Sequence, residues 1–110
     1  MSRVEPKSKA AAPVFAALGS TTRLELVSRL SDGKEYSITA LTEGLDLTRQ
    51  ATTKHLQVLQ HAGVVGCRRV GRENRFTIRP ASINEAKAYL RRVSDQWDSA
   101  IARLRSAVEE

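Results

Sequence analysis

Several features that mark other classes of protein are scarce in this sequence. Cys67 is the single cysteine, so no disulfide can form within the chain. The longest apolar stretches are much shorter than a bilayer-spanning helix, and the polar residues 1–9 lack the apolar block of a signal peptide. These absences predict a cytoplasmic protein without membrane contact, in which residues 1–9 form a flexible lead-in.

Catalytic and metal-binding patterns are missing as well. The sequence shows no nucleophile beside a base, no paired carboxylates and no glycine-rich phosphate loop, so we expect neither enzyme activity nor a cofactor. His55 and His61 lie six residues apart, whereas a chelating pair on one helix face is usually four apart. We therefore expect no metal site, and we expect His55 to pack or to hydrogen-bond locally.

Acidic residues are almost absent from residues 48–79. This segment holds seven basic residues against the single acid Glu73, so it carries the whole formal net charge of +6. Charge of one sign concentrated in this way favours a polyanionic partner. Phe76 is the only aromatic residue in the segment, whereas modules for single-stranded nucleic acids usually display several for base stacking. Duplex DNA is therefore the favoured partner.

Helical spacing and turn residues predict four helices before a change of pattern near residue 63. The chain of 110 residues suffices for one domain, which we place at residues 10–110. The predicted helices are residues 9–18 with Pro13 in the first turn, a second capped by Ser20 or Thr22, a third starting at Ser37, and residues 48–62.

A β-hairpin and a long helix follow these four. Residues 64–70 and 75–79 are predicted strands, joined by a turn at residues 71–74. The last helix begins with the capping-box spacing of Ser82 and Glu85. Its apolar residues recur every three or four positions, which predicts lengthwise packing against another helix. This stripe comprises Ile83, Ala86, Leu90, Val93, Trp97, Ala100, Leu104 and Ala107.

This order of elements predicts a mainly α fold with a small β-hairpin, the winged helix-turn-helix. A tight turn at residues 44–47 separates the third helix from the fourth, whose outer face carries only basic and hydrogen-bonding side chains. Such a helix fits the major groove, and an arginine-rich wing reaches phosphates or the adjacent minor groove. The predicted DNA-binding residues are Thr48, Arg49, Gln50, Thr53, Lys54, Gln57, Arg68, Arg69, Arg72, Asn74 and Arg75.

Three segments resemble the ArsR-type winged-helix repressors of bacteria and archaea. They are residues 14–24 (VFAALGSTTRL), residues 47–65 and residues 71–76 (GRENRF), and together they are specific. The resemblance implies a sequence-specific repressor that binds an imperfect palindrome. It also implies a homodimer built from the first and last helices. The cysteine pairs and histidine clusters of the family's metal sensors are absent here.

The interface expected from this resemblance and from the apolar stripe comprises Val14, Phe15, Leu90, Val93, Trp97, Ile101 and Leu104. Alternatives remain for particular residues and for the whole chain. Trp97 could line a ligand pocket near the dimer seam, and Cys67 could sense redox state rather than simply pack. A winged helix used for protein assembly, without DNA binding, would tolerate loss of the arginines. No effector can be inferred from the sequence.

Overall fold

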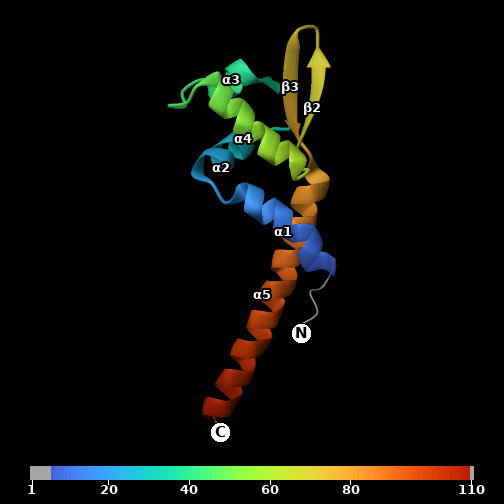
Figure 1. Ribbon diagram of the computed structural model, residues 1–110. Coiled ribbons are helices and arrows are strands. Elements are labelled where there is room, and N and C mark those ends of the chain that lie inside the picture. The colour runs from blue at the N-terminus through green and yellow to red at the C-terminus, as the bar shows by residue number, and fades with distance from the viewer. Residues whose placement is uncertain (1–5, 110) are drawn as a thin grey trace.

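The computed structural model describes residues 6–109, which form five helices and one three-stranded antiparallel sheet (Figure 1). The elements confirm the predicted winged helix-turn-helix fold. In chain order they are α1 (Pro6–Leu18), α2 (Thr21–Leu30), β1 (Tyr36–Ser37), α3 (Ile38–Thr42), α4 (Arg49–His61), β2 (Val65–Val70), β3 (Glu73–Ile78) and α5 (Pro80–Glu109). Residues 1–5 of the expected lead-in lie outside the described residues, and residues 6–9 belong to α1.

One apolar core joins the helices to the sheet. Its fully buried centre comprises Leu26, Leu30, Leu41, Leu56 and Leu59, each at most 1% exposed. These residues come from α2, α3 and α4, so the two helices of the helix-turn-helix are held by the same core as the helix before them. The other walls of the core are Val14 and Ala17 of α1, Val65 and Phe76 of the sheet, and Ala86 of α5.

Hydroxyl side chains fix where three of the helices begin. Ser20, Ser37 and Thr48 each accept a hydrogen bond from the backbone N–H three residues later, at 3.4, 3.1 and 3.0 Å. Each bond satisfies a donor that the helix itself leaves free. Of the two caps considered for α2, the structure uses Ser20 rather than Thr22.

Two predicted helix starts were wrong. Because α1 already begins at Pro6, Pro13 lies inside the helix and not in its first turn, where it removes one backbone hydrogen bond. The last helix begins at Pro80, two residues before Ser82, because proline is well suited to a first helical position. Strand β1 was not predicted at all. It pairs with β3, Tyr36 opposite Phe76, and makes β3 the central strand.

Helix α5 extends far beyond the rest of the molecule. Helix α1 crosses its first half, where the rings of Phe15 and Tyr89 lie 5.9 Å apart between centroids (Figure 1). The second half has no neighbour within the described chain and ends at the opposite pole from the hairpin tip. No helix in residues 6–109 is both long and apolar enough to cross a bilayer.

Candidate nucleic-acid interface

Helix α4 has one buried face and one polar face. Leu56 and Leu59 are fully buried, and so is Thr52, whose hydroxyl donates to the Thr48 carbonyl oxygen at 3.1 Å. The opposite face exposes the side chains of Arg49, Gln50, Lys54 and Gln57. Within residues 6–109 these four side chains make no hydrogen bond or ion pair, so their donors are free for a ligand.

The two threonines predicted on this face are used by the helix itself. Thr48 is the N-cap, and its hydroxyl oxygen accepts from the Ala51 N–H at 3.0 Å. The half-buried Thr53 donates its hydroxyl to the Arg49 carbonyl oxygen at 2.8 Å. Both hydroxyl groups keep further hydrogen-bonding capacity, but they also position the first turn of α4.

A partly buried contact holds His55. The Arg23 guanidinium lies with Nη1 3.2 Å from His55 Nδ1, and its Nε donates to the Ala17 carbonyl oxygen at 2.5 Å. Arg23 thus joins α2 to the end of α1 and to the inner side of α4. His55 was expected to pack or to hydrogen-bond locally, and its partner Arg23 lies 32 positions away in the sequence.

The hairpin β2–β3 forms the wing. Its tip is the turn at Gly71 and Arg72, where Gly71 has a φ of 62°, a conformation that favours glycine. Cys67 lies opposite Phe76 on the face that packs against the core, and Arg68 lies opposite Arg75 on the outer face. The packing of Cys67 agrees with the simpler of the two roles considered for it.

An acidic residue from outside residues 48–79 pairs with an arginine of the wing. Glu35, next to β1, accepts from Arg68 through both carboxylate oxygens, at 2.5 Å from Nε and 2.7 Å from the terminal nitrogen. These bonds lower the pKa of Glu35 and raise that of Arg68, and the charge of Arg75 lowers the pKa of Glu35 further. Because Arg68 and Arg75 face each other, Glu35 also offsets a like-charge pair. The charge count by sequence segment missed this pairing.

The other wing side chains differ in whether they form ion pairs or hydrogen bonds within the described residues. Arg75 lies 3.3 Å from the carboxylate of Glu73, and Arg69 donates to the Gly71 carbonyl oxygen at 3.3 Å. Arg72 and Asn74 are exposed, and their side chains make no hydrogen bond or ion pair within the described residues. The tip of the wing therefore carries the freest cation of the hairpin.

A polar hollow of about 210 Å³ lies between the wing tip and the start of α4. It brings together Arg49 and Arg72, which are 23 positions apart in the sequence. The hollow is also lined by residues of β1 and α3 that were not predicted to bind DNA. Its full lining is Ser37, Ile38, Thr39, Arg49, Arg72, Glu73 and Asn74.

The remaining predicted DNA-binding residues lie farther along α4 or on the wing. Lys54 and Gln57 border a shallow depression with Val58 and His61, towards the end of α4. Arg68, Arg69 and Arg75 do not border the hollow. The outer face of α4 and the wing tip therefore meet at Arg49, while Arg68 is the predicted site residue most fully paired within the chain.

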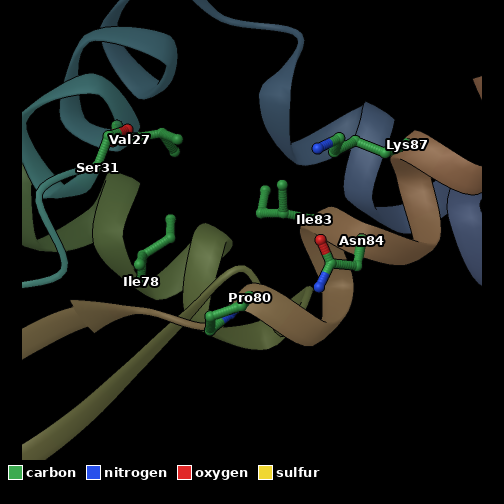
Figure 2. A pocket seen from close by; sticks show the side chains of 7 residues that line it. All are labelled: Val27, Ser31, Ile78, Pro80, Ile83, Asn84 and Lys87. Carbon is green, nitrogen blue, oxygen red and sulfur yellow. Dashed lines mark hydrogen bonds between the residues drawn. The ribbon is translucent and has the colours of Figure 1, made fainter.

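Another pocket, of about 230 Å³, lies where β3 enters α5. Figure 2 shows Val27, Ile78 and Ile83 converging on it, with Lys87 and Asn84 at its rim. The hydroxyl of Ser31 is directed to the Val27 carbonyl oxygen at 2.7 Å. The volume falls below the range of roughly 300–1,000 Å³ that is usual for small-molecule sites. We place the candidate site at α4 and the wing, because the exposed basic and hydrogen-bonding side chains without a partner in the described residues gather there.

The predicted interface residues divide into two groups. Val14 is 2% exposed and belongs to the core of the single chain, and Phe15 is half-buried against Tyr89, so α1 offers a partner less apolar surface than expected. Val93 is half-buried. The large exposed apolar residues of α5 are Leu90, Trp97, Ile101, Leu104 and Val108, between 47% and 85% exposed.

Comparisons with known proteins agree with this geometry. A sequence model described as a helix-turn-helix domain matches residues 18–68. An uncharacterised HTH-type transcriptional regulator of Bacillus subtilis, YuzN, is 40% identical over 65 residues, which cover 54% of this chain and 71% of the relative.

Solved structures extend the likeness over most of the chain. An ArsR-like transcriptional regulator from Rhodococcus sp. RHA1 is 36% identical, with a TM-score of 0.76, and the match covers 89% of this chain and 92% of the other. HlyU from Vibrio cholerae is 26% identical, with a TM-score of 0.66 over 86% of this chain and 98% of the other.

Proposed function

The chain belongs to the ArsR-like family of helix-turn-helix transcriptional regulators, and we propose that it represses transcription as a homodimer bound to an imperfect palindrome of duplex DNA. Regulators of this kind are DNA-binding proteins and not enzymes. Repression, the dimer and the palindrome are the proposed parts.

The observation that carries the proposal is the outer face of α4. Arg49, Gln50, Lys54 and Gln57 are exposed and have no partner within the described residues, although polar side chains of this length often pair on a protein surface. An α-helix fits the major groove, where arginine pairs with guanine and glutamine with adenine through two hydrogen bonds each. Thr48 and Thr53 then hold the first turn and reach the nearest backbone.

The wing supplies charge beside that face. The basic and polar residues on or near its tip are Arg69, Arg72, Asn74 and Arg75. Contacts from such residues to phosphates position a protein on DNA without reading its sequence. Arg68, which was predicted to bind DNA, is held by Glu35, so we assign it to fixing the wing to β1.

The exposed stripe on α5 supports the homodimer. Leu90, Trp97, Ile101 and Leu104 follow one another at intervals of seven, four and three residues, which keeps them on one side of the helix. A second copy of α5 packed along this stripe would cover it through a two-fold axis. Two α4 helices would then reach half-sites about one helical turn, roughly 34 Å, apart or a multiple of it.

A binding experiment tests the DNA part of this proposal. Duplexes selected from a random pool by the wild-type protein should bind it more tightly than unselected duplexes. A variant with Gln50 and Gln57 replaced by alanine should lose that preference, whereas Arg103→Ala, on the exposed part of α5, should keep it. If no duplex is enriched, sequence-specific binding is refuted. If variants without the arginines of α4 and the wing still bind a specific partner protein, the role in protein assembly is favoured instead.

A further inference from the structure

We propose that the hollow between the wing tip and the start of α4 is the seat of a single DNA phosphodiester, held from opposite sides by Arg49 and Arg72. The inference rests on the proposed function and adds a defined anion site to it. It also adds Ser37 and Thr39, which neither the charge pattern nor the helix face indicated.

The shape of duplex DNA places a phosphate strand between α4 and the wing. Each sugar–phosphate strand is the wall between a major groove and the neighbouring minor groove. A protein that places a helix in the major groove and a hairpin tip in the adjacent minor groove must therefore straddle one strand. The space between α4 and the wing is where that strand has to pass. The hollow of about 210 Å³ occupies this space.

The residues that line the hollow are suited to bind a phosphodiester. Arg49 comes from the first turn of α4 and Arg72 from the wing tip, and both are exposed without a partner in the part of the chain that the structure describes. A phosphodiester carries one negative charge on two non-bridging oxygens, so a guanidinium on each side can donate to it. Hydrogen bonds of this kind, between charged groups, are stronger than neutral ones.

Neutral donors complete the seat. The hydroxyl oxygen of Ser37 accepts from the Ala40 N–H at 3.1 Å, which leaves the Ser37 hydroxyl hydrogen free to donate. Thr39 and Asn74 are exposed at the same hollow. Each of these groups can donate to a phosphate oxygen from β1, α3 or the wing, and none of them adds negative charge.

Glu73 is the one acid in the lining. Its carboxylate lies 3.3 Å from Arg75, which does not border the hollow. An acid at this edge disfavours ligands of high negative charge. A diester with one charge suits the site better than a free phosphate with two.

This arrangement predicts that Arg49 and Arg72 act on the same group. Their effects on DNA binding should therefore be coupled. Arg49→Ala and Arg72→Ala should each weaken binding of a selected duplex about tenfold for each half-site, as expected for a charged phosphate contact, hence about a hundredfold for the dimer. The double variant should be weaker than either single variant, but clearly less weak than the product of the two effects.

A matched pair provides the control. Arg69 is also an exposed arginine of the wing, but it does not border the hollow. Arg49→Ala combined with Arg69→Ala should therefore weaken binding by the product of the single effects. Melting temperatures should be unchanged in all variants, because each of the three side chains is exposed. If the Arg49 and Arg72 effects simply multiply, the shared phosphate is refuted.

Chemically modified DNA locates the group. Methylphosphonates, which lack the charge, are introduced one position at a time along each strand of the duplex. We expect one position in each half-site at which the substitution weakens the wild-type protein but not the Arg49→Ala, Arg72→Ala double variant. If no position behaves in this way while inorganic phosphate raises the melting temperature of the wild type alone, the hollow binds free phosphate and the DNA assignment is wrong. If the wild-type protein binds no duplex, the proposed function itself fails.

Discussion

Replacing Trp97 by glutamate should convert a dimer in solution into a monomer. Trp97 is 65% exposed in the single chain, on the stripe that we assign to the interface. A tryptophan side chain buries up to about 250 Å², so covering the exposed part would remove roughly 150 Å² from water in each protomer. At about 25 cal/mol per Å², the two tryptophans would contribute about 8 kcal/mol to the free energy of dimerisation. Even half of that amount would weaken the dimer about a thousandfold.

Sedimentation equilibrium over a range of protein concentrations measures this effect. Ser99→Glu provides the matched control, because it adds the same charge two residues away, and Ser99 is exposed on the opposite side of the helix from Trp97. We expect Ser99→Glu to dimerise like the wild type. Circular dichroism should show that both variants keep the helical fold, since neither side chain belongs to the core.

Two results would refute the reasoning about α5. A wild-type protein that stays monomeric at all concentrations would show that the stripe has no second copy as its partner. A Trp97→Glu variant that dimerises as well as Ser99→Glu would show that the interface lies elsewhere.

Three further predictions concern the wing and α4. Arg72→Ala should reduce the slope of log K against log salt concentration by about 0.9 for each protomer, hence by about 1.8 for the dimer. Arg68→Gln should leave the slope nearly unchanged, since Arg68 is paired with Glu35, and equal slope changes would contradict this division. The pKa of Glu35 is lowered by Arg68, so the pair stabilises the fold at neutral pH and loses its effect as the pH falls through that lowered pKa. Glu35→Gln should therefore have a lower melting temperature than the wild type at pH 7. The difference in melting temperature should narrow once the pH drops below the usual glutamate pKa of about 4.3. A difference that stays constant with pH would contradict the role of the ion pair. Thr48→Ala should destabilise the protein by about 1 kcal/mol in urea unfolding, since the N-cap bond to Ala51 is lost, and no change would mean that the cap is dispensable.

The order of elements could be predicted because its signals are local. Ser20, Ser37 and Thr48 each lie next to the helix that they cap, and the strict alternation in residues 75–79 marks a strand whatever it pairs with. The outer face of α4 followed from helical periodicity alone. These features depend on residues within a few positions of one another, so they can be predicted without knowledge of the tertiary structure.

The features that were missed depend on contacts between distant residues. Strand β1 has two residues and exists only through its pairing with β3, and Glu35 meets Arg68 across 33 positions because that pairing brings them together. Val14 was expected at the dimer interface, but it is buried by the core of its own chain. An apolar residue on one face of a helix predicts that this face is buried. Whether the core of the same chain or a second copy buries it can be seen only in the structure.

Hydroxyl-radical footprinting of a selected duplex tests the central claim most directly, namely that α4 and the wing form one DNA-binding surface. We predict protected sugars in two clusters on one face of the duplex, about one helical turn or a multiple of it apart. Arg72→Ala should lose protection in the minor groove beside each cluster and keep it at the major groove. Protection spread evenly along the duplex, or loss of both clusters together without loss of affinity, would contradict the claim.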